Sequence, residues 1–368
     1  MSLRILFALP GLHRVGRGAE IALMSVASEL AKGGDKVTLI GSGEPSEGTP
    51  YKFLHSGALP RGLFERFPKL PTLRNETAYE ELTFLPGFLW QYNPSDYDIT
   101  VACSYPFVQW ALRRPSGGER PAHIFVTQNG DWPVHSNKSE YRFFSCDGVI
   151  CINPDYYETA RSLWRAALIP NGVAVDHFTP GPGDRAKFGL PEGKRLVLMV
   201  SALIASKRVD EGIRAIAQLP DVHLVCAGDG PERAAIDRLA AELLPGRFTR
   251  LTAAPADMPL LYRSCDAFLH LSLDESFGNV FVEALACGLP VVAEDWERTR
   301  WIVGDDQFLC NTRDQNALAE QIEQSLAPGE AHAEIGRERA QQFSWANVAT
   351  QYRDFFEQVI AARRSSAD

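Results

Sequence analysis

Two glutamates, Glu275 and Glu283, frame the stretch of this sequence with the clearest capacity for chemistry. Glu275 follows "DAFLHLSL", an apolar run typical of a buried strand, and Glu283 lies in "NVFVEALACG", which is typical of a short helix. In open α/β sheets, ligands bind beyond the carboxyl ends of the strands. The N–H groups at a helix start favour a phosphate, and Gly278 lets the backbone approach a ligand closely. A ligand with a phosphate and several hydroxyls, such as a nucleotide sugar, would use all of these groups.

The whole string E-S-F-G-x-x-x-x-E carries this interpretation, not either acid by itself. A helix cap would explain Glu275 alone, and a solvated position on a helix would explain Glu283 alone. Only a binding site explains why two acids, a glycine and a helix start share one short segment.

Strands alternate with helices along most of the chain. "RILFAL", a helix over 18–34 and "DKVTLIG" form a βαβ opening, which predicts a parallel sheet. A second βαβ series starts at "RLVLMVSAL", with helices expected over 209–218 and 231–243. Between the series, the Gly- and Pro-rich segment 167–184 is typical of an interdomain linker. The pattern predicts two α/β domains with a cleft between them, followed by an amphipathic helix over 343–364.

Composition excludes several classes of protein. The chain has 368 residues, 45% of them hydrophobic, which suffices for two cores. A net charge of -9 argues against charge-driven nucleic-acid binding. The seven cysteines include no C-x-x-C pair, which favours reduced thiols in a cytosolic protein and disfavours a metal site. No apolar run is long enough to span a bilayer, and the first apolar run is better explained as a buried strand than as a signal peptide.

Six segments, in order, resemble motifs of the family 4 retaining glycosyltransferases, which have the GT-B fold. "ESFGNVFVEALACGLPVVA" resembles their E-x7-E signature, and "GAE" resembles their N-terminal glycine loop, with Arg17 in place of one glycine. "IPNGVAVDHFTPG" resembles their domain linker, with Ala174 in place of an aspartate. The other three are "VSALIASKRVDEGIRAI", "CAGDGPER", and "FSW" with the helix that follows it.

The resemblance implies a domain organisation. Residues 1–178 would form an N-terminal, acceptor-side Rossmann-like domain, and residues 179–346 a C-terminal domain that binds the nucleotide sugar. The two domains would face each other across a cleft. A C-terminal helix, 347–368, would cross back and complete the first domain.

The resemblance also implies the donor site. Lys207 would pair with the donor pyrophosphate, Glu283 would bind the ribose hydroxyls, and Glu275 would contact the donor sugar, so that Glu275 and Lys207 are the expected catalytic residues. For Arg208 a solvated position is an equal alternative. The full set of expected donor contacts is Gly16, Gly18, Lys207, Arg208, Gly228, Glu275, Ser276, Phe277, Gly278, Asn279 and Glu283.

Two departures from the family pattern bear on activity. Ser201-Ala202 stands where the family usually has glycine and arginine, and Asn129 stands where it often has a histidine near the reacting sugar. Asparagine cannot shuttle a proton, but it can hydrogen-bond a hydroxyl. Asp131 and Trp132 are candidate acceptor contacts, with a turn or core role as the alternative. His123, inside a strand, is expected to be a buried structural histidine.

The implied activity is retaining transfer of a sugar from a nucleotide-diphosphate sugar to a hydroxyl of a saccharide or lipid-linked saccharide. No cofactor is expected, and no metal either, because the donor-site segments contain no D-x-D motif. A nucleotide-sugar epimerase and a catalytically impaired nucleotide-sugar-binding protein are the alternatives. A nicotinamide dehydrogenase is disfavoured because "GRGAEI" lacks the third glycine of the dinucleotide fingerprint.

Segment 59–74 mixes basic and apolar side chains, as peripheral membrane segments do. Its prolines break any long helix, and a solvated flap over the core is the alternative. The expectation is a cytoplasmic protein that can sit at the inner membrane face. The basic and apolar residues of the segment are Arg61, Arg66, Lys69 and Arg74, and Leu63, Phe64, Phe67 and Leu70.

Overall fold

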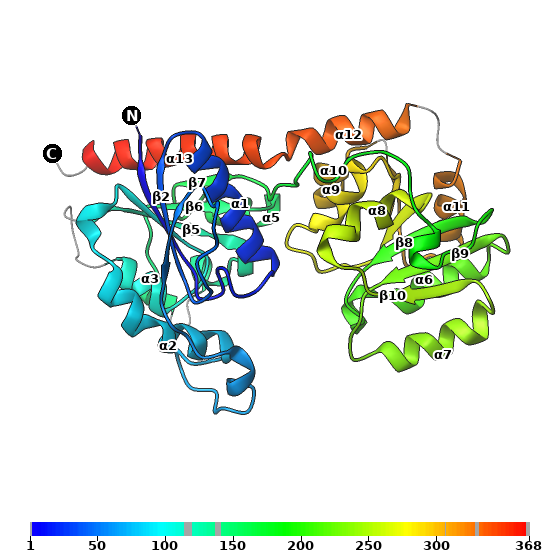
Figure 1. The fold of residues 1–368 in the computed structure, drawn as a ribbon, viewed down its shortest axis with the longest axis horizontal. Helices are drawn as coiled ribbons and strands as arrows, with labels where there is room; N and C mark the ends of the chain where they lie inside the picture. Colours follow the sequence, from blue (N-terminus) through cyan, green and yellow to red (C-terminus); the bar gives the residue numbers. More distant parts are fainter. Residues whose placement is uncertain (1, 114–119, 137–140, 306, 328–330, 366–368) are drawn as a thin grey trace. The chain divides into compact units, whose positions relative to one another are not determined.

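A computed structural model describes the chain except residues 1, 114–119, 137–140, 306, 328–330 and 366–368 (Figure 1). The described residues form two compact units. Unit 1 comprises Met1–Asn171 and Trp345–Asp368, and unit 2 comprises Gly172–Ser344. The boundary therefore falls a few residues before the predicted 178/179 position. Among the described helices, none is long and apolar enough to cross a membrane.

Unit 1 is built on a seven-stranded parallel sheet with the strand order β3-β2-β1-β4-β5-β6-β7. Its central strands are apolar on both faces, because a parallel sheet is covered by helices on both sides. In β1, Leu6 and Ala8 face one layer and the alternate residues Ile5 and Phe7 face the other. The strands are β1 (Arg4–Ala8), β2 (Lys36–Gly41), β3 (Lys52–His55), β4 (Ile99–Ala102), β5 (Ala122–Val126), β6 (Gly148–Cys151) and β7 (Ala166–Leu168).

Helices cover this sheet in two groups, as Figure 1 shows. Helices α2 and α3 pack against each other, and Phe84 and Phe88 of α2 join Leu6 and Ala8 in one core cluster. Helix α1 packs against α13. The helices of unit 1 are α1 (Gly18–Lys32), α2 (Glu76–Gln91), α3 (Phe107–Leu112), α4 (Trp132–His135), α5 (Pro154–Ala160) and α13 (Trp345–Ser365).

The final helix, α13, is the predicted amphipathic helix, and it packs in unit 1 against α1 and β5. An ion pair of 3.1 Å between Arg353 Nε and Asp35 Oδ2 adds to the packing. The side chains expected on its apolar face are all buried, namely Val348, Tyr352, Phe355, Phe356 and Val359.

Two stretches differ from the sequence-based expectation. Residues 44–95, rich in prolines and aromatics, break the regular alternation of strands and helices in the sequence, yet they contain β3 and the long helix α2. Pro86 lies inside α2 on its exposed side and has no N–H to donate to the carbonyl of Leu82, four residues earlier. Leu82 is 38% exposed, so its carbonyl, which lacks a helical partner, lies toward water. Asn75 caps the helix by accepting from the N–H of Ala78. Strand β7 also lies partly within the segment expected to be a linker.

Segment 59–74 follows β3 and packs against α2 through a 3₁₀ turn, Arg61–Phe64. Phe64 is buried and stacks on Tyr79 of α2, with ring centroids 5.3 Å apart. Arg61 forms an ion pair with the buried carboxylate of Glu80. The bridge between Leu70 and Leu73 closes the segment. Its flap-like attachment thus uses Phe64 and Arg61, two residues expected to be available to a membrane.

Unit 2 repeats the architecture with six parallel strands in the order β10-β9-β8-β11-β12-β13. Helices α6, α7 and α11 share a core cluster with the central strands. The strands are β8 (Arg195–Val200), β9 (Val222–Ala227), β10 (Phe248–Leu251), β11 (Ala267–His270), β12 (Val291–Glu294) and β13 (Phe308–Cys310). The helices are α6 (Val209–Ala217), α7 (Arg233–Leu243), α8 (Met258–Arg263), α9 (Asn279–Ala286), α10 (Glu297–Val303), α11 (Gln315–Ser325) and α12 (His332–Gln342).

Candidate functional site

The loop between β11 and α9 carries the first glutamate of the pair. Gly278 caps α9 with φ of +80°, a left-handed conformation that favours glycine. A Cβ there would also lie 2.8 Å from the ring of Phe281. Phe277 anchors the loop, because its buried ring packs 5.8 Å from Phe343 and 6.2 Å from Trp301, measured between centroids. The sequence therefore fixes the backbone of this loop at the carboxyl end of the sheet.

Glu275, in this loop, contacts the side chains of Lys207 and His270. Its Oε1 contacts Lys207 Nζ in an ion pair and lies 3.0 Å from His270 Nε2. Burial alone would raise the pKa of Glu275, but the hydrogen bond and charge of His270 and those of Lys207 outweigh it. The resulting pKa is about 2, so the carboxylate is ionised at neutral pH.

Strand order explains how these side chains meet. Lys207 ends a 3₁₀ turn, Ala205–Lys207, that follows β8, and His270 ends β11. Because β8 and β11 are neighbours in the sheet, their carboxyl ends place both side chains beside Glu275. Ser272 Oγ lies 3.5 Å from Lys207 Nζ in the same cluster.

The sequence reasoning missed His270 because it lies in a run that was interpreted only as an apolar strand. The ring of His270 is 4% exposed and packs edge-on against Phe281 at 4.8 Å. The sequence does carry a signal for His270, because it is the single polar residue of the strand "AFLH" and lies at its carboxyl end. A polar residue at that end of a parallel strand points to the ligand-binding edge of the sheet.

Arg298, on α10, was also missed, and it donates from Nη1 to the backbone carbonyl of Glu275. Arg298 follows β12, which flanks β11 on the side opposite β8, so the loop after β11 is held from both sides. A small pocket opens at this point. It is lined by His270, Ser272, Glu275, Phe277, Phe281, Glu294, Trp296, Arg298, Thr299 and Ile302.

Glu283, in the second turn of α9, has a different partner. Tyr262 of α8 donates its hydroxyl to Glu283 Oε2 at 2.9 Å. Burial raises the pKa of the Glu283 carboxyl, and the Tyr262 hydrogen bond opposes that rise. Ser276 lies in the loop before α9, and Asn279 is the first residue of the helix. Glu283, Ser276 and Asn279 thus belong to one loop-and-helix unit with Glu275.

The expected donor contact of Arg208 is not supported. Its side chain is buried, and its guanidinium donates to the carboxylate of Glu211, the carbonyl of Leu271, and the hydroxyl and carbonyl of Thr312. The alternative, a solvated position, is also wrong. Arg208 adopts φ of +53° and ties the Lys207 turn to the end of β11. It positions Lys207 and does not present its own charge.

The glycines of the expected site differ in what requires them. A Cβ at Gly228 would lie 1.9 Å from the carbonyl oxygen of Ser201, so the loop after β9 needs glycine to pack on the loop after β8. A Cβ at Gly16 or at Gly18 would meet nothing within 4 Å, so packing does not explain either residue. At Gly11, which the sequence reasoning passed over, a Cβ would collide with the buried carboxylate of Glu20.

The acceptor-side candidates lie together after β5 in unit 1. Asn129 is exposed, and its Nδ2 donates to the carbonyl of Cys103 at 3.3 Å. Asp131 Oδ2 lies 3.3 Å from His135 Nε2. Trp132 is 40% exposed, and its ring covers Gly130 so closely that a Cβ there would lie 2.4 Å away. Both Asn129 and Trp132 therefore present side-chain surface to solvent at the carboxyl end of the sheet.

His123 is the buried structural histidine that the sequence predicts. Its ring is fully buried in β5, and Nδ1 lies 2.9 Å from Thr100 Oγ1. Burial lowers the pKa of His123 to about 3, so the ring is neutral at physiological pH.

Stability should depend on the charge of Glu275 at acid pH. Because its pKa in the folded protein lies below the ordinary 4.5, its stabilising contribution is present above about pH 4.5 and is lost as the pH falls toward about 2. We expect the difference in the free energy of unfolding between the wild type and E275Q to shrink over that interval, measured by urea unfolding. The exposed Glu320→Gln serves as the control. A difference that stays constant down to about pH 3 would contradict the assignment.

Part of the chain is similar to a known protein family. Residues 182–342 match the family model described as "Glycosyl transferases group 1". The chain is 29% identical over 210 residues to the lipopolysaccharide core biosynthesis glycosyltransferase LpsE of Rhizobium meliloti, covering 55% of this chain and 59% of that protein. It is 36% identical over 199 residues to the D-inositol 3-phosphate glycosyltransferase of Mycolicibacterium smegmatis, covering 50% and 45%. The chain thus spans about half the length of the curated relatives it matches.

Solved structures match over nearly the whole chain. A sucrose-phosphate synthase from Thermosynechococcus elongatus aligns with a TM-score of 0.77 at 22% identity, covering 98% of this chain and 100% of that one. Anabaena HepE in complex with UDP-glucose aligns with a TM-score of 0.69 at 19% identity, covering 97% and 100%. The chain has the GT-B fold that the sequence predicts, and residues 182–342 are similar to the group 1 glycosyl transferases.

Proposed function

We propose that this protein is a retaining glycosyltransferase of family 4, which moves a sugar from a nucleotide-diphosphate sugar to a hydroxyl acceptor. The observation that carries the proposal is the contact of Lys207 and His270 with Glu275 at the carboxyl ends of β8 and β11. That cluster lies beside the start of α9, within the segment that matches the group 1 glycosyl transferases. A cation, a helix start and a carboxylate are the groups that a diphosphate sugar requires.

Each part of the donor has an assigned partner in the proposal. Lys207 binds the diphosphate through its positive charge, and the N–H groups of Gly278 and Asn279 bind it at the positive end of the α9 helix dipole. Glu283, held by Tyr262, accepts hydrogen bonds from the ribose hydroxyls. Glu275 accepts hydrogen bonds from the sugar ring, since its low pKa keeps it an acceptor.

The proposed reaction exchanges one bond at the anomeric carbon on a single face. The bond from that carbon to the phosphate oxygen breaks, and the bond to the acceptor oxygen forms. The acceptor proton passes to the departing phosphate oxygen, so a protein base is not needed and Asn129 can stand in the place of a histidine. Lys207 stabilises the negative charge that develops on the leaving diphosphate, which is where such a group lowers the barrier most.

We place the acceptor beside Asn129, Asp131 and Trp132 in unit 1, and we propose a saccharide or lipid-linked saccharide. An exposed tryptophan next to amide and carboxylate groups suits a sugar, which presents apolar C–H faces and hydroxyl edges. LpsE, the relative named for lipopolysaccharide core biosynthesis, gives this class of acceptor further support. The seven free thiols support a reducing, cytoplasmic location.

Product analysis tests the proposal. The purified protein is incubated with a productive donor, a saccharide acceptor and excess EDTA, and the product's anomeric configuration is determined by proton NMR. We expect a product with the donor's configuration and an undiminished rate in EDTA. An inverted product would contradict the retaining mechanism, and a rate abolished by EDTA and restored by a divalent cation would contradict metal independence.

We further propose that segment 59–74 contacts a membrane surface. Leu59, Leu63, Phe67 and Leu70 are between 49% and 58% exposed, and they lie among exposed basic residues of the same segment. Apolar anchors among basic groups bind anionic lipid surfaces through both burial and charge.

Vesicle flotation tests this contact with the double variant L63S/F67S. We expect the wild type to float with vesicles that contain phosphatidylglycerol and the double variant to bind about tenfold or more weakly, since two exposed apolar side chains are lost. Leu163→Ser is the matched control, because Leu163 is 58% exposed elsewhere in unit 1. Flotation of the double variant equal to that of the wild type, or none by the wild type, would refute the contact.

A further inference from the structure

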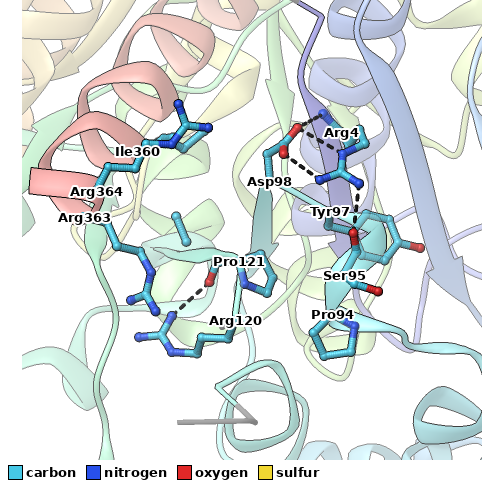
Figure 2. Close-up of a pocket in the computed structure, with 11 residues that line it drawn as sticks. Arg4, Pro94, Ser95, Tyr97, Asp98, Arg120, Pro121, Ile360, Arg363 and Arg364 are labelled. Carbon is cyan, nitrogen blue, oxygen red and sulfur yellow. Dashed lines mark hydrogen bonds and ion pairs between the residues drawn. The ribbon is translucent and has the colours of Figure 1, made fainter. Parts of the chain in front are cut away.

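A second concave site lies in unit 1, at the amino ends of the strands (Figure 2). It is a pocket of about 300 Å³ that begins where β1, β4 and β5 begin and is closed by the last turns of α13. The acceptor-side candidates follow the carboxyl end of β5, whereas this pocket precedes its amino end. The two sites therefore lie at opposite ends of the same sheet.

Four arginines line the pocket, namely Arg4, Arg120, Arg363 and Arg364, whereas Asp98 is the one acid among the described residues of its lining. Figure 2 shows Arg120 and Arg363 reaching toward each other from the loop before β5 and from α13. Both bind Asp147, which is not part of the lining: Arg120 Nη1 lies 2.6 Å from Asp147 Oδ2, and Arg363 Nη1 lies 2.9 Å from Asp147 Oδ1.

Carboxylates neutralise only part of this charge. Arg4 is paired with Asp98, with Nη2 and Oδ1 2.8 Å apart, while Asp147 is shared by two arginines. Among the described residues that line or adjoin the pocket, four arginines face three acids, Asp96, Asp98 and Asp147. A surplus of positive charge in a concave surface raises the local concentration of anions.

A structural role explains three of the four arginines. Arg4 joins β1 to the start of β4 through Asp98, and Arg120 and Arg363 join α13 to the sheet through Asp147. Arg364 is different, because among the residues that the structure describes it makes no ion pair. It is exposed on the last turn of α13 and lines the pocket. Its charge attracts Asp98 from beyond ion-pair distance, which leaves its guanidinium without a direct carboxylate contact among the described residues.

Arginine is the side chain best suited to a phosphate group, since its planar guanidinium forms two parallel hydrogen bonds with two oxygens. The rest of the lining adds polar groups from Ser95 and Tyr97 and an apolar wall from Ile360. A volume of about 300 Å³ is at the small end of ligand sites, which suits a single small molecule.

We propose that this arginine pocket binds the phosphate group of a small phosphorylated solute, at a site separate from the donor and acceptor residues. Bound phosphate bridges the end of α13 to the amino ends of the strands. It thereby stabilises the folded state of unit 1 by an amount that grows with the logarithm of the phosphate concentration above the Kd.

Thermal unfolding of the full chain tests the site with inorganic phosphate as the probe. We expect Tm to rise with the logarithm of the phosphate concentration above the Kd, by about 2 °C or more beyond the rise produced by potassium chloride of equal ionic strength. In R364Q the phosphate concentration needed for the same rise in Tm should increase about tenfold or more, because one charged hydrogen-bonding partner is lost. The exposed Arg161 of unit 1 supplies the matched control, R161Q, which should behave as the wild type.

Two further experiments identify the site and the kind of phosphate compound behind the rise in Tm. The same titration of K207A separates this pocket from the proposed diphosphate site, and we expect the phosphate response to persist there. Flotation with phosphatidic acid vesicles, done with L63S/F67S to remove the contact proposed for segment 59–74, separates a lipid phosphate from a soluble one. No flotation beside the soluble response supports a small solute, whereas flotation that R364Q abolishes in the same background would overturn that assignment in favour of a lipid headgroup. A phosphate response equal in R364Q and wild type, absent in K207A, or no larger than that of chloride, overturns the proposal.

Discussion

Replacing Lys207 by alanine is expected to lower kcat/KM for the donor about 100- to 1,000-fold, the range observed when a group that stabilises transition-state charge is removed. Lys207 lies among partly buried groups, with its side chain 18% exposed, so water replaces its charge poorly. Most of the loss should appear in kcat, because the charge on the diphosphate grows as the sugar leaves. Initial rates over a range of donor concentrations measure both constants.

Lys187→Ala is the matched control for this prediction. Lys187 is another lysine of unit 2, but it is 42% exposed and pairs with Asp257 on the surface. It should keep the wild-type rate, since exposed ion pairs contribute little. Equal losses in both variants, or a K207A rate within about twofold of the wild type, would show that Lys207 does not act on the leaving group.

Replacing Glu283 by alanine should instead raise the donor KM about 10- to 100-fold and leave kcat within a few-fold of the wild type. Hydrogen bonds to a carboxylate contribute about 1.5–3 kcal/mol each. Contacts to the ribose are made equally in the ground and transition states, so their loss weakens binding without slowing the chemical step.

Two variants make this second prediction specific. Tyr262→Phe removes only the hydroxyl that holds Glu283 Oε2, and we expect a smaller rise in KM. Glu320→Ala, at an exposed position on α11, should have no effect. An E283A enzyme with an unchanged KM and a kcat lowered 100-fold would place Glu283 at the reacting sugar and contradict the assignment.

The periodicity of the sequence was enough to predict the strands and most of the helices. Both central strands, β1 and β8, are near-continuous apolar runs, and α13 shows five apolar side chains on one face. Helix α2 was not predicted, because residues 44–95 are rich in prolines and aromatics and show no regular pattern. Proline disfavours a helix interior, and Pro86 lies inside α2. Its exposed position and the burial of Phe84 and Phe88 outweigh that propensity, and burial is a property of the folded chain.

The site was predictable residue by residue but not as an arrangement. Motif matches pointed to Lys207 and Glu275 separately, and their contact joins residues 68 positions apart through two neighbouring strands. No local pattern distinguishes the partly buried Lys207, which faces the cluster around Glu275, from the adjacent, buried Arg208. Arg208 is buried because the order of the strands brings Thr312, 104 positions later in the chain, within hydrogen-bond distance of its guanidinium.

The most direct test of the account is a panel of UDP-, GDP-, ADP- and dTDP-sugars, measured by thermal unfolding and donor hydrolysis with the wild type and E283A. The account predicts that one donor raises Tm and is slowly hydrolysed, and that E283A loses both responses at the same donor concentration. Donor binding without turnover of any kind would identify a nucleotide-sugar-binding protein in place of an enzyme. No response to any donor would contradict the assignment of Lys207, Glu275 and Glu283 to a nucleotide-sugar site.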